Sequence, residues 1–173
     1  MEDEEAIAAS VVAGTDGIEV PTELVEEPDK GAAVEKSLLQ KLQEMPVGAK
    51  IKLALRGNRE TRMLLLRDAN RMIRRFVLQN PRLGDDEIIA ICKNRSADEE
   101  LLRIIADSRE WTKNYQVRIS LTSNPKTPLV LALRFVSGLP DRDIRMLAKS
   151  KNVSQTVAAA AKRIVATKPP GAG

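Results

Sequence analysis

Apolar residues recur with a helical period of about 3.6 residues along most of the chain, from residue 33 to residue 168. Val34, Leu38 and Leu42, for example, fall on one stripe of a helix. No segment alternates apolar and polar residues for long enough to predict a strand. The pattern therefore predicts about ten short helices. They cover residues 33–45, 46–57, 58–67, 68–80, 85–94, 96–109, 111–124, 127–138, 139–151 and 153–168.

Capping residues mark several of the expected helix boundaries. Asn58 and Asp68 are expected N-caps, because their short side chains can accept hydrogen bonds from the free N–H groups of a first turn. Ser96 and Glu99 have the spacing of a capping box. The other expected boundary residues are Pro46 and Pro128 at first helical positions, Thr127 as a cap, and Gly57 and Gly138 as terminators.

Two Asn-Pro pairs, beginning at Asn80 and Asn124, each close an apolar helical pattern. Since the residue before a proline is disfavoured in the α conformation, each Asn is expected to end a helix and each proline to begin a turn. The surrounding segments correspond too. Residues 71–81 align with 115–125 and 88–92 with 132–136 at an offset of 44, and 102–109 align with 144–151 at an offset of 42.

A period of this length, with two or three short helices in each repeat, is typical of an α-solenoid. Each repeat of a solenoid buries its apolar face against its neighbours. We therefore predict an all-α fold, a short right-handed α-solenoid, over residues 32–167. A disordered acidic tail, residues 1–31, precedes it, and a frayed C-terminus, residues 168–173, follows it.

The strings SREWTKNYQ (108–116) and NPKTPLVLALRF (124–135) carry a resemblance to a known class. With the later LAKSKNV, they make the chain resemble uncharacterised bacterial helical-repeat proteins of the HEAT-like and leucine-rich-repeat-variant kind. The resemblance covers residues 45–165, and it implies a binding scaffold. Metal-binding members of the class carry an N-terminal cysteine cluster, which this sequence lacks, so no iron–sulfur cluster is implied.

Composition supports a helical fold and excludes several kinds of chemistry. Hydrophobic residues make up 43% of the chain but aromatic residues only 2%, so the core must be aliphatic. With no histidine and one cysteine, the chain has neither a Cys/His zinc site nor a histidine general base. We predict a protein that is not an enzyme and that has no cofactor and no metal. No apolar run is long enough to span a membrane, and we expect a reducing cytoplasmic setting.

Charge is divided unevenly along the chain. Residues 1–30 hold ten acidic residues against a single base, Lys30, whereas the rest holds 27 Lys and Arg against 14 Asp and Glu. An acidic segment therefore precedes a basic body. Such a division is typical of proteins that bind a charged partner or shield their own basic surface.

The residues that could support catalysis have simpler structural explanations. Cys92 lies on the apolar side of its expected helix, where a lone cysteine behaves as a small hydrophobic residue. A reactive thiol is the alternative. Pairs of acidic residues fall at expected helix starts, where they complement the helix dipole. These pairs are Asp85 with Asp86, Glu99 with Glu100, and Asp141 with Asp143.

Trp111 and Tyr115 are expected on one face of one helix, because they are four residues apart. They could stack on bases or contact a partner. The interpretation we prefer makes them a structural wedge between repeats. Glu110, next to Trp111, is the one hint of a helical-repeat hydrolase or glycosylase.

Arginines provide the candidate binding surface. Arg71, Arg74 and Arg75 share one facet of a helix, and Arg118 stands at the Arg74 position one repeat later. If successive repeats place them on one side, they form a positive stripe suited to anionic ligands. The candidate surface consists of Arg67, Arg71, Arg74, Arg75, Arg118, Arg134, Arg142 and Arg145.

These observations predict a non-enzymatic protein–protein interaction scaffold with a basic helical-repeat surface. An acidic protein partner is the leading candidate, and the chain's own N-terminal tail is another. The alternative is a nucleic-acid-binding HEAT-like protein, whose affinity would fall steeply with salt. A third interpretation is a basic face that serves solubility alone. Neither a membrane nor a metal is expected as a partner.

Overall fold

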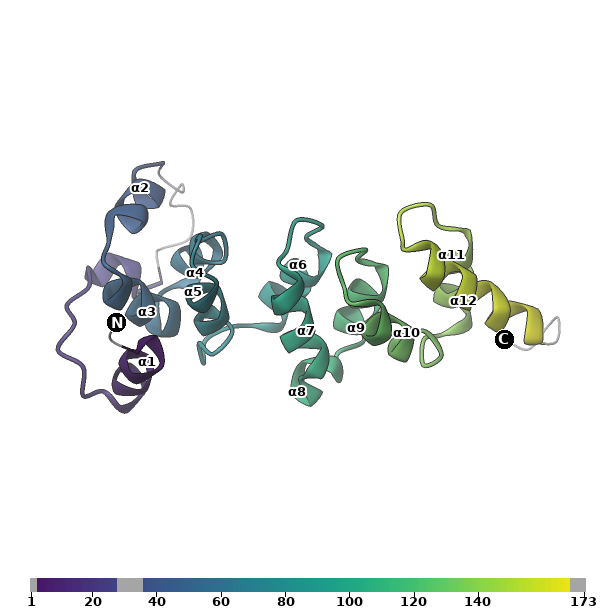
Figure 1. The fold of residues 1–173 in the computed structure, drawn as a ribbon, viewed down its shortest axis with the longest axis horizontal. Coiled ribbons are helices and arrows are strands. Elements are labelled where there is room, and N and C mark those ends of the chain that lie inside the picture. Colours follow the sequence, from purple (N-terminus) through teal and green to yellow (C-terminus); the bar gives the residue numbers. More distant parts are fainter. Residues whose placement is uncertain (1–2, 28–35, 169–173) are drawn as a thin grey trace. The chain divides into compact units, whose positions relative to one another are not determined.

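The computed structural model describes residues 3–27 and 36–168, and within them the chain is all α-helical (Figure 1). It divides into two compact units, Met1–Leu83 and Gly84–Gly173, called unit 1 and unit 2 below. The helices of unit 1 are α1 (Glu4–Ala13), the 3-10 helix η1 (Thr22–Leu24), α2 (Lys36–Glu44), α3 (Val47–Arg56), α4 (Arg59–Leu65) and α5 (Arg71–Val77).

Unit 2 contains seven further helices, and none of the described residues forms a strand. They are α6 (Asp85–Lys93), α7 (Glu99–Asp107), α8 (Arg109–Thr112), α9 (Tyr115–Ser123), α10 (Leu129–Val136), α11 (Asp141–Lys149) and α12 (Gln155–Thr167). Helix α6 packs on α9, α9 on α10, and both α10 and α11 pack on α12. The buried side chains of α10, α11 and α12 form one aliphatic core, with Val136, Ile144 and Leu147 each 1% exposed.

The acidic N-terminal segment is a packed part of unit 1. Helix α1 packs on α3, and α3 packs on α5. Val11 is 1% exposed and Leu24 2%, and both belong to the same core as Ile51 and Phe76. The predicted disorder of the tail is therefore wrong for residues 3–27. Residues 28–31 of that predicted tail lie outside the described residues, as do the last five residues of the predicted C-terminal fray.

The two Asn-Pro turns make the same set of hydrogen bonds. The Asn80 side-chain amide donates to the carbonyl oxygens of Ala54 and Gly57, at the end of α3, at 2.9 and 3.3 Å. The Asn124 amide donates to the carbonyls of Cys92 and Asn94, at the end of α6, at 2.7 and 3.0 Å. In both turns the side-chain oxygen accepts a backbone N–H two residues on. Each buried asparagine thus satisfies the last carbonyls of a neighbouring helix.

A second pair of matching contacts lies just before each of these turns. Asn70 caps α5 and Asn114 caps α9, each by accepting the N–H two residues later. Arg74 donates to the carbonyls of Asp68 and Ala69, and Arg118 donates to those of Thr112 and Lys113. Arg74 and Arg118, which the sequence aligns, therefore make matching contacts with the turns before their helices.

Some predicted helix boundaries are confirmed and others are wrong. Asn58 caps α4 by accepting the Thr61 N–H at 3.0 Å, and Gly57 ends α3. Asp68, however, accepts the N–H of Asn70, which is the actual cap of α5. The observed cap, Asn70, thus lies two residues after the predicted cap, Asp68.

Other predicted boundary residues also differ from those in the structure. Asp98, not Ser96, caps α7. Thr127 is buried and its hydroxyl has no hydrogen-bond partner in the structure, while Pro128 precedes the first residue of α10. Pro46 likewise stands just before α3. Residues 33–35 of the first predicted helix lie outside the described residues.

Candidate interaction surfaces

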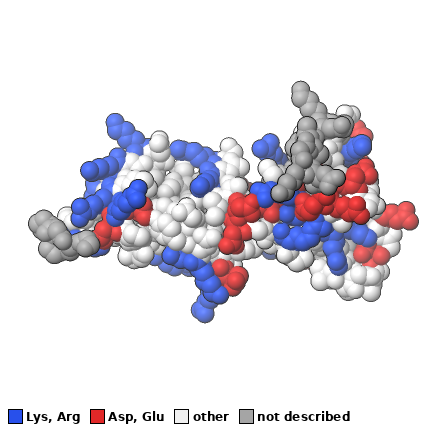
Figure 2. All heavy atoms as spheres, turned by 180° about the vertical axis from the view of Figure 1, so that it is seen from behind, with Lys and Arg blue, Asp and Glu red and all other residues white. Residues whose placement is uncertain are grey.

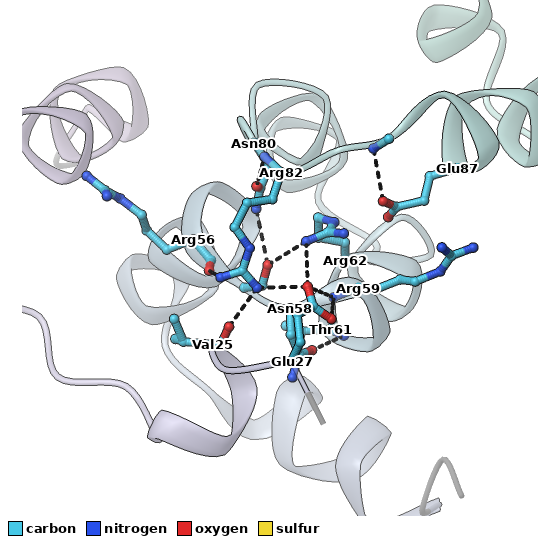
Figure 3. Close-up of polar contacts among 12 residues, drawn as sticks. Val25, Glu27, Arg56, Asn58, Arg59, Thr61, Arg62, Asn80, Arg82 and Glu87 are labelled. Atoms are coloured by element: carbon cyan, nitrogen blue, oxygen red, sulfur yellow. Dashed lines mark hydrogen bonds and ion pairs between the residues drawn. The ribbon is translucent and has the colours of Figure 1, made fainter. Parts of the chain in front are cut away.

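In addition to its apolar core contacts, the N-terminal segment is held in unit 1 by hydrogen bonds to its backbone carbonyl groups (Figure 3). Asn58, which is 2% exposed, donates its amide to the carbonyls of Glu23 and Glu26 at 2.9 and 2.7 Å. The Thr61 hydroxyl donates to the Leu24 carbonyl at 3.1 Å. A side chain that caps α4 therefore also fixes the chain that passes over it.

Basic side chains of unit 1 bind both the carbonyls and the carboxylates of this segment. Lys52 forms an ion pair with Asp16 at 2.7 Å and also donates to the Ile18 carbonyl. Arg82 donates to the Val25 carbonyl at 2.7 Å and to Glu27 at 2.9 Å (Figure 3). Lys52 and Arg82 are not among the binding residues predicted from the sequence.

 The partners of Lys52 and Arg82 are backbone carbonyls and single carboxylates, so the sequence carries no pattern that would have identified these two residues.

The two carboxylates that take part are stabilised in their charged form. The hydrogen bond from Lys52 lowers the pKa of Asp16 below its ordinary value of 3.8. Partial burial alone would raise the pKa of Glu27, but hydrogen bonds from Arg82 and from the Arg59 backbone N–H outweigh it. The pKa of Glu27 therefore lies below its ordinary value of 4.5.

Acid is expected to weaken the attachment of the N-terminal segment. A carboxyl group whose pKa is lowered by folding stabilises the folded state above its unfolded pKa, and this contribution is lost as the pH falls through the folded pKa. The melting temperature of unit 1 should therefore fall as the pH is lowered from 5 to 3. In the double variant Asp16→Asn, Glu27→Gln the fall should be shallower, as circular dichroism would measure.

The matched control for this experiment is Glu19→Gln, which changes an exposed side chain of the same segment. It should reproduce the wild-type dependence on pH. If the double variant and the wild type lost stability in parallel between pH 5 and pH 3, these carboxylates would not hold the segment in place.

Arg74, Arg118 and Arg134, all among the predicted binding arginines, donate hydrogen bonds to backbone carbonyls of the chain itself. Arg74 and Arg118 bind the turns before their own helices, as described above. Arg134 donates to the Ala106 carbonyl at 2.6 Å and lies over the Phe135 ring, 5.1 Å from its centroid. Arg74 and Arg118 therefore hold turns together, and Arg134 joins α10 to the last turn of α7.

The other five predicted arginines are divided between the two units. Arg67 and Arg71 are exposed near α5, and Arg75 is half-buried beside Met72. Arg142 and Arg145 are exposed on α11. Figure 2 shows Lys and Arg side chains gathered near the C-terminal end of unit 2, whereas acidic side chains are more numerous over unit 1.

Trp111 and Tyr115 do not share a helix, so the prediction of one helix over residues 111–124 is wrong. Trp111 belongs to the short helix α8, and Tyr115 begins α9. Asn114 separates them, because its side chain caps the new helix. Both aromatic side chains are half-buried. The Tyr115 hydroxyl donates to Asp143, and this hydrogen bond raises the pKa of Tyr115.

The remaining candidates for chemistry have structural surroundings. Cys92 is fully buried, and burial raises the pKa of its thiol to about 12, so the thiol remains protonated and unreactive at neutral pH. Glu110 is exposed and pairs with Lys113 at 2.9 Å. The predicted acidic pairs do lie in the first turns of α6, α7 and α11.

Metal and membrane sites can be considered for the described residues alone. Within residues 3–27 and 36–168, no three His, Cys, Asp or Glu side chains are grouped so that they could hold a metal ion. Among the helices of that same part of the chain, none has the length and hydropathy that a membrane span requires.

A groove of about 420 Å³ is present in unit 2. Its walls are the C-terminal end of α6, one side of α9 and part of α11 with the turn that follows it. Ile119, Met146 and Val153 make the lining largely apolar, and Lys93 and Arg95 also line the groove. Periodicity could not predict this groove, because it depends on the packing of three helices that are separate in sequence.

Comparisons with known proteins found no similarity: no family model, curated protein or solved structure matches this chain. The resemblance to HEAT-like and leucine-rich-repeat-variant proteins remains a prediction from sequence.

Proposed function

We propose that this chain is a non-enzymatic helical-repeat scaffold, a short right-handed α-solenoid, that binds an acidic protein partner through basic side chains of unit 2. The repeat is supported by the matching contacts of Asn70, Arg74 and Asn80 with those of Asn114, Arg118 and Asn124. Three equivalent polar residues at a spacing of 44 make equivalent contacts, which is expected of repeated structural units.

The exposed face of α11 is the observation that carries the proposed function. Arg142, Arg145 and Lys149 follow one another at helical spacing and are all exposed. No hydrogen bond or ion pair joins the side chains of these three residues to another described residue, although Arg142 lies near enough to Tyr115 to act on it electrostatically. The two acidic residues of α11, by contrast, are both engaged, Asp141 with Lys168 and Asp143 with Tyr115. This face therefore offers cations to an outside partner.

The contacts of the N-terminal segment support the choice of an acidic polypeptide as partner. In unit 1, Lys52 and Arg82 each bind one carboxylate and one backbone carbonyl of the same segment. This combination suits a peptide, which supplies both groups, better than it suits a nucleic acid. Because unit 1 is already occupied by this segment, we assign the partner to unit 2.

Fluorescence anisotropy with two labelled probes tests this function. An acidic peptide made mostly of glutamate should bind at low salt, and Arg142→Glu with Arg145→Glu should abolish its binding. Reversing the exposed Lys162 and Arg163 of α12 gives the same change in net charge elsewhere, and it should have a much smaller effect. If a DNA or RNA duplex bound instead, with a steep dependence on salt, the nucleic-acid alternative would replace this proposal.

A further inference from the structure

The groove of unit 2 contains a buried polar atom without a partner. Ser120, on α9, is 5% exposed, and its hydroxyl oxygen makes no hydrogen bond in the structure. Ser120 lines the groove together with Ile119 and Leu147. Because a buried hydroxyl without a hydrogen bond costs stability, its position in a groove wall favours a ligand that supplies the missing partner.

The charged residues of the groove lining indicate the charge of such a ligand. All the lining residues belong to the described part of the chain, and none of them is an Asp or a Glu. Lys93, the last residue of α6, and Arg95, two residues later, are both exposed, and no hydrogen bond or ion pair joins their side chains to another described residue. Asn124 donates to the Cys92 and Asn94 carbonyls nearby, which reduces the negative potential of that helix end. The lining therefore favours an anion.

The groove also exposes an apolar side chain that would be better covered. Met146 is 53% exposed and forms part of the wall contributed by α11. It lies on the same helical face as Arg142 and Lys149, at spacings of four and three residues. An apolar anchor surrounded by cations is the surface expected for a short amphipathic acidic segment.

We propose that this groove binds an acidic peptide segment of the partner, with one branched aliphatic side chain against Met146 and Ile119. In this arrangement a backbone group of the peptide hydrogen-bonds the Ser120 hydroxyl, and its carboxylates face Lys93 and Arg95. This inference rests on the proposed function and adds to it a site and a ligand chemistry. An open groove suits a peptide that inserts one side chain, since a small molecule needs more complete enclosure.

Two peptides that differ in one residue test the site. A labelled glutamate-rich peptide with a central leucine should bind about tenfold more tightly than the same peptide with serine there, because only the leucine buries an aliphatic side chain. Met146→Asp should remove this preference. The control is Met63→Asp, which makes the same change at a side chain of unit 1 that is 54% exposed, and it should leave the preference intact.

The outcomes separate this inference from the proposed function. If both peptides bound equally and Met146→Asp had no effect, while Arg142→Glu with Arg145→Glu abolished binding, the groove would be excluded and the basic face retained. If the wild-type protein bound neither peptide, both proposals would fail. Ser120→Ala is a second test: it should keep the melting temperature and weaken the leucine peptide by about threefold, as expected for one lost hydrogen bond.

Discussion

Deletion of residues 1–27 is expected to abolish the cooperative unfolding of unit 1. The deletion removes Val11 and Leu24 from the core and exposes the side chains beneath them. Burial of a Val or Leu side chain contributes about 1.5–3 kcal/mol each. The total loss, with the hydrogen bonds to Asn58 and Thr61, is then comparable with the entire stability of a small domain. Thermal denaturation followed by circular dichroism would measure it.

A neighbouring pair of residues gives a test that does not require a truncated protein. Val11 is 1% exposed and Val12 is 64% exposed, so alanine at each position has a different expected cost. Val11→Ala should destabilise unit 1 by roughly 2 kcal/mol, whereas Val12→Ala should change its stability by less than about 0.5 kcal/mol. Equal and small effects at both positions would mean that the N-terminal segment is not packed as described.

The second large effect is expected at the Asn-Pro turns. Replacing Asn80 or Asn124 by alanine removes two hydrogen bonds to carbonyls at a helix end and one to a turn N–H. The Gly57 and Asn94 carbonyls each keep one other donor, from Arg62 and from the Ala97 N–H. Because each asparagine is buried, at 4% and 5% exposure, water cannot readily replace it. We expect each variant to lose about 2–4 kcal/mol of unfolding free energy, measured by urea denaturation.

Asn94 provides the matched control for these variants. Its side chain is exposed and accepts one hydrogen bond, from the Ser96 N–H, so Asn94→Ala should cost less than about 1 kcal/mol. Asp at position 80 or 124 would keep the acceptor but lose the donors, and it should be at least as damaging as alanine. If alanine at positions 80 and 124 cost no more than it does at 94, the two turns would not have the structural role assigned to them.

Much of the fold could be predicted because its signals are local. Apolar periodicity, with boundary residues such as Gly57 and Asn58, is enough to place most helices within a few residues. The equivalence of Asn80 and Asn124 was also visible, since an Asn-Pro pair restricts the backbone wherever it occurs. The break at Asn114 was missed because the apolar period continues across it, although an asparagine is a favourable helix cap.

The role of the N-terminal segment could not be predicted in this way. Its composition is that of a disordered chain, and in α1 only Ala8 and Val11 are buried. The contacts that hold it use the carbonyls of Val11, Ile18 and Glu23, which every residue type possesses. Backbone groups leave no trace in sequence, so only the structure reveals which basic side chains they occupy.

The same contacts decide which basic residues are open to a partner. Lys52, Arg56 and Arg82 are occupied by the N-terminal segment. Arg142 and Arg145 are not occupied by this segment, and Met146, which is on the same helix, lines the groove of unit 2. The proposed function therefore depends on the N-terminal segment being a fixed part of unit 1, and not a mobile competitor for the basic surface.

Amide hydrogen exchange of the intact protein tests most directly whether the N-terminal segment is a fixed part of unit 1. Exchange should be slow in α1, and also at the backbone N–H of Asn58, which donates to the Leu24 carbonyl at 2.8 Å. Protection in α1 should approach that of α3, on which it packs. Exchange throughout residues 3–27 at the rate of an unstructured peptide would contradict the account and return the segment to a disordered tail.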